Sequence, residues 1–150
     1  YYDKVFSIAR GVLLDGEEAA DAVQEIFTLV FKNVHRFDRR SRFSTWLFRI
    51  AVNRSIQQSR SGRHRQKNVE LTEALETAVE PELTEPADPA VESSMARLQP
   101  TDRAILTLFY WEDMSLNDIA ASLGCGVNAA KTRLFRARER FRKFYEEASR

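Results

Sequence analysis

Apolar residues recur with the spacing of an α-helix through the first third of the chain. The stripes at i, i+3, i+4 and i+7 predict three amphipathic helices there. Their apolar positions are Val5, Ile8, Ala9, Val12 and Leu13, then Ala20, Val23, Phe27, Val30, Phe31 and Val34, and then Phe43, Trp46, Leu47, Ile50 and Ala51. Asp15 and Gly16 end the first helix, the second begins at Glu17, and Ser44 is expected to cap the third. No segment shows the period of a strand, so the sequence predicts an all-α fold.

Two further helices around a tight turn are predicted between residues 115 and 138. Ser115 and Asp118 form a capping box, in which the hydroxyl accepts from a first-turn amide and the carboxylate reaches back. The apolar stripe of the first helix consists of Leu116, Ile119, Ala120 and Leu123. Gly124 favours the left-handed conformation that ends a helix, and Gly126 lets the backbone of the turn adopt conformations that other residues avoid. The pattern is that of a helix-turn-helix.

The helix after the turn carries the residues expected to read DNA. Its apolar stripe consists of Val127, Ala130, Leu134, Ala137 and Phe141. That stripe leaves outward or flanking positions for Asn128, Lys131, Thr132, Arg133, Phe135 and Arg136. Arg and Lys suit guanine edges and phosphates, while Asn and Thr suit adenine or mixed edges. A helical hairpin with a solvated basic face would carry the same charges, but the basic residues cluster after the turn, which favours DNA binding.

The net charge of the chain is only +1, but its charged residues are distributed unevenly and divide it into three segments. Residues 1–66 carry 12 Lys and Arg against 7 Asp and Glu, residues 67–92 carry 1 against 8, and residues 93–150 carry 10 against 7. The acidic segment also holds Pro81, Pro86 and Pro89, which favours an extended or disordered linker. We therefore expect two small helical domains, 1–66 and 93–150, joined by a flexible acidic linker, 67–92.

Several functional classes find no support in the sequence. Cys125 has no cysteine to pair with, and His35 and His64 lack the spacing of zinc ligands, so neither a metal nor a cofactor is expected. The sequence shows no nucleophile–histidine set and no Gly-rich phosphate loop, which argues against an enzyme. No apolar run approaches the roughly 20 residues that span a bilayer. These features predict a soluble cytoplasmic protein without membrane contact of its own.

Three strings, taken together and in this order, carry a resemblance to a known family. They are DAVQEIFTLVF at residues 21–31, FSTWLFRIAVNR at residues 43–54 and KTRLFRAR at residues 131–138. With the linker between the second and third, the chain resembles a bacterial extracytoplasmic-function (ECF) sigma factor of the sigma-70 family. The resemblance implies a specificity subunit that binds core RNA polymerase and directs it to promoters, with an anti-sigma factor as a further partner. Where the family often has Gly-Thr-Val before the basic recognition residue, this chain has Asn128, Ala129 and Ala130.

The resemblance also implies roles for particular residues. Residues 1–66 would be sigma domain 2, which contacts polymerase through Asp21, Gln24, Glu25 and Phe31. The same domain would bind the minus-10 element through Arg39, Arg40, Arg42, Arg49 and Asn53. Residues 93–150 would be sigma domain 4, which reads the minus-35 element through Asn128, Lys131, Thr132, Arg133, Phe135 and Arg136 while its apolar helices meet the polymerase flap. The linker would thread the RNA exit path, or serve as a simple tether.

Two other classes of protein remain open. A DNA-binding regulator could use the same helix-turn-helix, dimerise through its first domain and bind an inverted repeat alone. An adaptor could present similar surfaces without contacting DNA. Trp46 is aromatic and could stack on an exposed base, but its place on the apolar stripe with Phe43 and Leu47 favours core packing.

Overall fold

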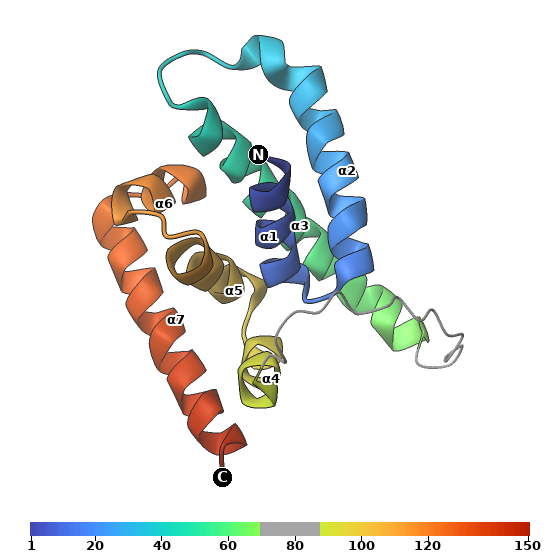
Figure 1. Cartoon of the computed structure of the whole chain (residues 1–150), viewed down its shortest axis with the longest axis vertical. Coiled ribbons are helices and arrows are strands. Elements are labelled where there is room, and N and C mark those ends of the chain that lie inside the picture. The colour runs from blue at the N-terminus through green and yellow to red at the C-terminus, as the bar shows by residue number, and fades with distance from the viewer. Residues whose placement is uncertain (70–87) are drawn as a thin grey trace.

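A computed structural model describes residues 1–69 and 88–150, with side chains described for 1–61 and 88–150. Its helices are α1 (Tyr2–Leu13), α2 (Gly16–Asn33), the 3-10 turn η1 (Val34–Arg36), α3 (Phe43–Val69), α4 (Pro89–Arg97), α5 (Pro100–Leu106), the π-helical turn η2 (Thr107–Trp111), α6 (Leu116–Leu123) and α7 (Val127–Ala148). The described residues form no strand, so the predicted all-α fold is confirmed (Figure 1).

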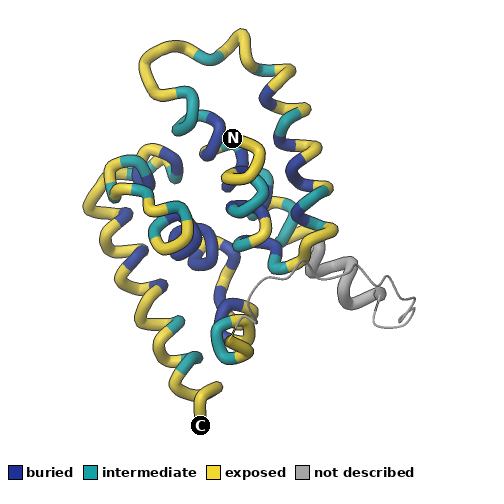
Figure 2. The backbone as a smooth tube through the Cα atoms, in the orientation of Figure 1, coloured by how far each residue is buried: buried dark blue, intermediate teal, exposed yellow. Residues whose placement is uncertain are grey.

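The helices form two groups that pack against each other. In the first half, residues 1–69, α1, α2 and α3 contact one another, and in the second half, residues 88–150, α7 packs along α4, α5 and α6 (Figure 1). Helix α1 also contacts α5 and η2, and α3 contacts α5 and α6. Buried residues of both halves, from Val5 and Ile8 to Ile105 and Leu108, belong to one hydrophobic cluster. Figure 2 marks buried positions along the helices of both halves. The two halves therefore share a core.

Side-chain caps mark where several helices begin. The Asp15 carboxylate accepts from the amides of Glu17 and Glu18 at 2.8 and 3.0 Å, which satisfies donors left free at the start of α2. At α4 the Asp88 carboxylate accepts from the Ala90 amide at 2.9 Å, and Pro89 occupies the first turn. Proline suits that position because its missing N–H is not needed there.

The ends of the predicted linker are helical where the structure describes them. Residues 67–69 belong to the last turn of α3, and residues 89–92 belong to α4. The rest of the predicted linker, residues 70–87, lies outside the described residues.

The apolar face of α2 differs from the predicted stripe. The buried residues are Ala19, Ala22, Val23, Ile26 and Val30. Phe31 and Val34 were expected in the stripe, but they are 83% and 49% exposed. The buried set follows i, i+3, i+4, i+7 and i+11 spacing from Ala19, so the face that packs on α1 and α3 is rotated from the one that the large side chains suggested.

The start of α3 and the start of α7 also differ from expectation. Helix α3 begins at Phe43, and the Arg42 carbonyl accepts from the Trp46 amide at 3.2 Å, so Ser44 lies inside the first turn and does not cap the helix. Val127, expected in the stripe of α7, is 38% exposed because it stands at the first position of the helix.

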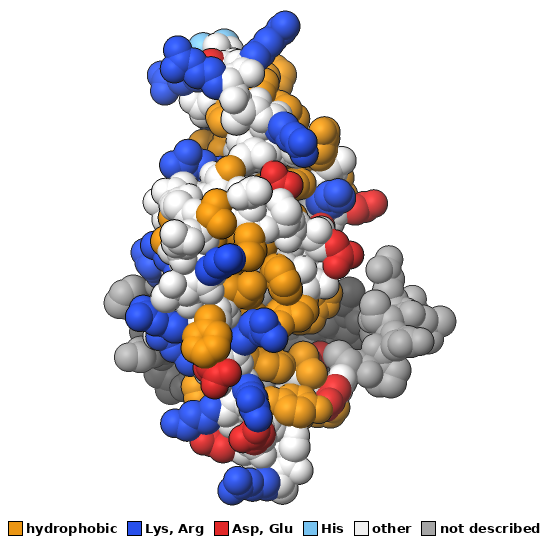
Figure 3. Space-filling view, turned by 90° about the vertical axis from the view of Figure 1, so that its left-hand side faces the viewer, with side chains coloured by type: hydrophobic (Ala, Val, Ile, Leu, Met, Phe, Trp, Pro, Cys, Tyr) orange, Lys and Arg blue, Asp and Glu red, His pale blue; other side chains and the backbone are white. Residues whose placement is uncertain are grey.

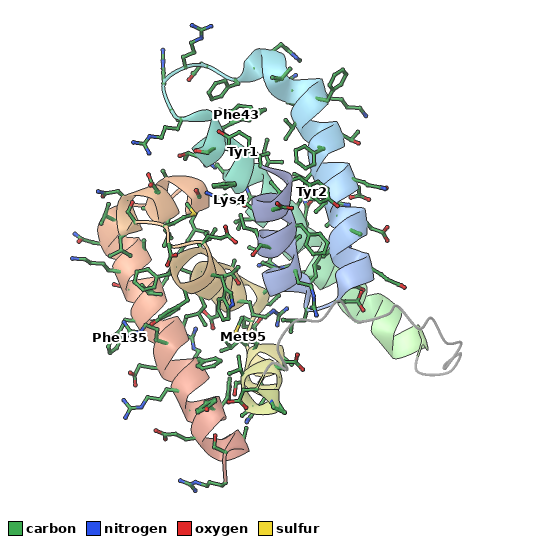
Figure 4. The ribbon with its side chains drawn as sticks, viewed as in Figure 1. Tyr1, Tyr2, Lys4, Phe43, Met95 and Phe135 are labelled. Atoms are coloured by element: carbon green, nitrogen blue, oxygen red, sulfur yellow. The ribbon has the colours of Figure 1, made fainter. Side chains whose placement is uncertain are left out.

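An aromatic cluster fixes the start of α3. The ring of Phe43 lies 5.6 Å from that of Phe37, 5.7 Å from that of Trp46 and 5.6 Å from that of Tyr1. Figure 4 shows Tyr1 at the N-terminus next to Phe43. Edge-to-face and tilted ring contacts of this kind add to the stabilisation that apolar burial gives. Trp46 packs in this cluster, as its position on the stripe predicted.

Candidate nucleic-acid interface

The helix-turn-helix forms as the sequence predicts and turns one face of α7 outward. The Ser115 hydroxyl accepts from the Asp118 amide at 3.1 Å, which is the first of the two bonds of the expected capping box. Gly124 ends α6 with φ 69°, the left-handed conformation that glycine adopts without strain. Ala130, Leu134 and Ala137 are buried against the rest of the second half. The opposite side of α7 is therefore free.

All six predicted DNA-reading residues of α7 are exposed: Asn128, Lys131, Thr132, Arg133, Phe135 and Arg136. Phe135 is 64% exposed and points away from the body of the protein (Figure 4). The Thr132 hydroxyl donates to the Asn128 carbonyl at 3.1 Å, so its hydrogen is already used within the helix. Figure 3 looks onto this side of the molecule and shows Lys and Arg side chains along it. Exposed basic residues at the start of such a helix are placed to meet bases and phosphates.

The predicted basic residues of the first half lie in two places. Arg39, Arg40 and Arg42 are exposed in the connection before α3, at the end of the molecule that Figure 1 shows uppermost. Arg40 lies 3.8 Å from Asp38, but both side chains are mostly in solvent and the pair contributes little. Arg49 and Asn53 are exposed on α3 itself. The Arg49 guanidinium lies against the turn of the helix-turn-helix at Gly124.

A polar cleft brings part of the two predicted DNA sites together. It has a volume of about 750 Å³, and α3 and α7 supply most of its polar lining. The lining polar residues on these two helices are Asn53, Gln57 and Arg60 of α3 and Arg133, Arg136 and Arg140 of α7. Val52, Ile56 and Ile105 contribute apolar surface. Arg39, Arg40 and Arg42 are not part of this cleft.

The charges of the cleft are mostly unbalanced. Arg140 donates to the Asp102 carboxylate at 2.9 and 3.1 Å. Among the side chains that the structure describes, Arg60, Arg133 and Arg136 form no ion pair. The cleft is therefore a site of concentrated positive charge, suited to phosphate groups. Three lining residues, Gln57, Arg60 and Arg140, were not predicted from the sequence, although Gln57 and Arg60 continue the polar row of Asn53 along α3.

The predicted polymerase-binding residues share one exposed face of α2. Asp21, Gln24, Glu25 and Phe31 are all exposed, and their spacing places them along one side of the helix. Glu25 forms an ion pair with Arg54 of α3, which ties this face to the neighbouring helix. Phe31 is the most exposed large apolar residue of the described chain, at 83%.

A second, apolar groove was not predicted from the sequence. Its volume is about 590 Å³, and α4, the end of α5, η2 and α7 form its walls. The apolar lining residues are Val91, Met95, Leu106, Tyr110, Trp111 and Phe141. Tyr110 and Trp111 are 48% and 56% exposed at the π-helical turn. The adjacent aromatic residues of this turn are the sequence signal that could have revealed the groove.

Neither a metal site nor a membrane span is found in the part of the chain that the structure describes. No group of three or more His, Cys, Asp or Glu side chains there could hold a metal ion. No helix there is long and apolar enough to cross a bilayer.

Comparison with known proteins gives matches to both halves. Residues 1–65 match sigma-70 region 2, and residues 89–141 match sigma-70 region 4. The ECF RNA polymerase sigma factor SigW of Bacillus subtilis is 32% identical, over 95% of this chain and 83% of that protein. The RNA polymerase sigma-H factor of Pseudomonas aeruginosa is 30% identical, over 93% and 79%. The ECF RNA polymerase sigma-E factor of Escherichia coli K12 is 32% identical, over 93% and 79%.

Two solved structures share the fold. One is the sigma factor RpoE in complex with the anti-sigma factor NepR from Bartonella quintana, with a TM-score of 0.73 and 22% identity over 97% of this chain and 91% of that one. The other is CnrH in complex with the cytosolic domain of CnrY, with a TM-score of 0.68 and 23% identity over 96% and 81%.

Proposed function

The chain belongs to the ECF sigma factors of the sigma-70 family, which direct RNA polymerase to promoters, and from this we propose how its surfaces share that task. Residues 1–66 contact core polymerase and the minus-10 element, and residues 93–150 read the minus-35 element. The observation that carries the proposal is the exposed basic face of α7, which is the second helix of a well-formed helix-turn-helix. A sigma factor contributes specificity and leaves catalysis to the polymerase.

The minus-35 element is assigned to α7. Asn128, Lys131, Arg133 and Arg136 lie within the first three turns of the helix, where a recognition helix meets base edges in the major groove. Buried Ala130, Leu134 and Ala137 hold the opposite side of the helix on the domain. Residues farther along α7, such as Arg142, pair with neighbours instead.

The minus-10 element is assigned to the connection before α3 and to the exposed row of α3. Melting a promoter exposes bases and phosphates of a single strand. Arg39, Arg40 and Arg42 supply positive charge for phosphates, and the Asn53 amide offers both a donor and an acceptor for a base edge. Trp46 supports this surface from within the aromatic cluster, without touching a base.

Polymerase contacts are assigned to two surfaces. The exposed face of α2 with Asp21, Gln24 and Phe31 suits a partner that combines polar and apolar contacts. The groove beside Tyr110 and Trp111 suits an apolar segment of the polymerase flap. Since the two solved structures of similar fold are complexes with an anti-sigma factor or with the cytosolic domain of CnrY, we also propose an anti-sigma factor as a partner.

The decisive experiment is in vitro transcription with bacterial core polymerase on fragmented genomic DNA, with the 5′ ends sequenced. New start sites that share two spaced upstream motifs would support the proposal. No new starts from a folded chain would favour the DNA-binding regulator or the adaptor.

Alanine variants then separate the two elements. Lys131→Ala or Arg136→Ala should weaken binding to the cognate minus-35 element by about 1 to 3 kcal/mol, and an equal loss on every sequence would mean phosphate contact. Asn53→Ala should impair minus-10 discrimination with polymerase binding intact. Arg142→Ala is the matched control on α7, because its side chain points to Glu146 and away from the reading face.

A further inference from the structure

Two rows of polar side chains line the cleft between α3 and α7. The rows are Asn53, Gln57 and Arg60 on α3, and Arg133, Arg136 and Arg140 on α7. Spacings of three and four residues place the members of each row on one side of their helix, so both rows border the same space. All six residues are exposed, and the cleft is therefore open to solvent.

The positive charge of the cleft exceeds what the fold itself uses. Four arginines and one aspartate are among the lining residues. That aspartate, Asp102, is 7% exposed, and its carboxylate accepts from Arg140 at 2.9 and 3.1 Å. Among the side chains that the structure describes, Arg60, Arg133 and Arg136 have no ion-pair partner. Like charges three or four positions apart weaken a helix, so the row on α7 does not serve the stability of α7.

An apolar wall and a side-chain amide complete the cleft. The apolar wall consists of Val52, Ile56, Ile105 and Leu123. The side-chain carbonyl of Gln57 accepts from Arg54 at 3.3 Å, which leaves the two N–H groups of the Gln57 amide for a ligand. The cleft volume of about 750 Å³ lies within the range of about 300 to 1,000 Å³ that is usual for small-molecule sites. These features suit a ligand with a strongly anionic part and room for an apolar part.

We propose that this cleft binds a small polyphosphate, either a nucleotide or a short inorganic polyphosphate. The guanidinium groups of Arg60, Arg133 and Arg136 bind the phosphate oxygens, because a planar guanidinium presents paired N–H donors that match two oxygens of one phosphate. These three cations come from two different helices, so a chain of phosphates satisfies them better than a single phosphate does. The amides of Asn53 and Gln57 donate to further oxygens, and the apolar wall accommodates the base of a nucleotide.

Two of these arginines also belong to the residues that we propose read the minus-35 element. Arg133 and Arg136 cannot bind a phosphate chain and promoter DNA at the same time, so the ligand and DNA should compete for α7. Gln57 and Arg60 belong to the ligand site alone. The binding of the ligand does not depend on the proposed function, whereas the competition rests on it.

Isothermal titration calorimetry of the full chain, without DNA or polymerase, tests the site. The titrants are sodium tripolyphosphate, ATP and sulfate, at about 0.15 M salt so that long-range attraction between exposed charges is screened. The variants are Arg60→Ala and Arg136→Ala. Arg142→Ala is the matched control, because it removes the same charge from α7 at a position outside the cleft.

We expect tripolyphosphate, ATP or both to bind at one site per chain, at least about tenfold more tightly than sulfate. Arg60→Ala and Arg136→Ala should each weaken this binding about tenfold, the usual loss for a hydrogen bond to a charged group, and Arg142→Ala should bind as the wild type does. Tighter binding of ATP than of tripolyphosphate would identify a nucleotide as the ligand, and equal affinity would identify the phosphate chain. Binding of both no tighter than that of sulfate, or equal affinities for Arg60→Ala and Arg142→Ala, would overturn the proposal.

A competition measurement separates this proposal from the proposed function. Fluorescence anisotropy follows a duplex with the minus-35 element while tripolyphosphate is added, and we expect the duplex to be displaced. If the calorimetry gives the expected losses but the duplex stays bound, the reading role of Arg136 is wrong and the ligand site is supported. Failure of the transcription assay would likewise count against the proposed function alone.

Discussion

Replacing Arg103 by methionine removes the bonds that cap α1 and α4 and keeps most of the side-chain volume. The guanidinium donates at 2.8 Å to the Val12 carbonyl and at 2.6 Å to the Leu98 carbonyl, and it is almost fully buried. A buried carbonyl that loses its donor costs about 1 to 3 kcal/mol. Part of this lost stability is offset, because methionine is uncharged and its burial carries no penalty for desolvating a charge. For two carbonyls, we expect Arg103→Met to lower the free energy of unfolding by about 3 kcal/mol.

Urea unfolding followed by circular dichroism measures this loss. With a dependence on urea of about 2 kcal/mol per molar, the midpoint should fall by about 1.5 M. Arg103→Lys keeps the charge but cannot reach both carbonyls with one ammonium group, so its midpoint should lie between those of methionine and the wild type.

Arg97→Met is the matched control. Arg97 pairs with Glu147 at 2.6 Å and lies over the Phe144 ring, but both side chains of the ion pair are nearly half exposed, so this loss should be smaller than that at Arg103. An Arg103→Met midpoint no lower than that of Arg97→Met would refute the reasoning, because the buried carbonyls would then have found other donors at no cost.

Three further predictions concern single elements. Ser115→Ala should lower the free energy of unfolding by about 1 kcal/mol in a urea titration, since it removes the cap of α6; no change would mean that water replaces the hydroxyl. Ala137→Leu should lower the free energy of unfolding by about 1 to 3 kcal/mol in the same titration, because Ala137 is fully buried on α7 and a larger side chain would overpack the core. An unchanged midpoint would reveal a void beside Ala137. The hydrogen bond from Arg97 lowers the pKa of Glu147, so an NMR titration should place its midpoint below the ordinary 4.5, and Arg97→Gln should raise it. The contribution of this pair is present above the unfolded pKa of glutamate and is lost as pH falls through the lowered folded value; an unshifted midpoint would contradict the pairing.

Helix positions and the helix-turn-helix could be predicted from the sequence because their signals are local. The stripe of Ile119 and Ala120, the cap at Ser115 and the left-handed glycine at Gly124 all lie within ten residues, and the structure forms each of them. The exposure of Lys131 and Arg136 follows from the same periodicity, since Ala130, Leu134 and Ala137 define the opposite face.

Local signals were insufficient where a helix could bury either of two adjacent faces. In α2 the larger side chains suggested a stripe through Phe31, but α1 and α3 pack on the face of smaller residues that includes Ala19 and Ala22. The packing of α2 against α1 and α3 therefore decided that Phe31 is exposed to solvent. Close helix packing favours small side chains at the contact, and hydrophobicity alone does not record that preference.

The sequence by itself determined the all-α class, the three helices of the first half, the helix-turn-helix and the basic face of α7. Only the tertiary structure decided that the two halves pack on each other and that Arg103 bonds to Val12 across the interface. The physical reason is range: periodicity and capping act between residues a few positions apart. The bonds of Arg103 join positions 91 residues apart, and nothing in the local pattern specifies which buried carbonyl a distant side chain will meet.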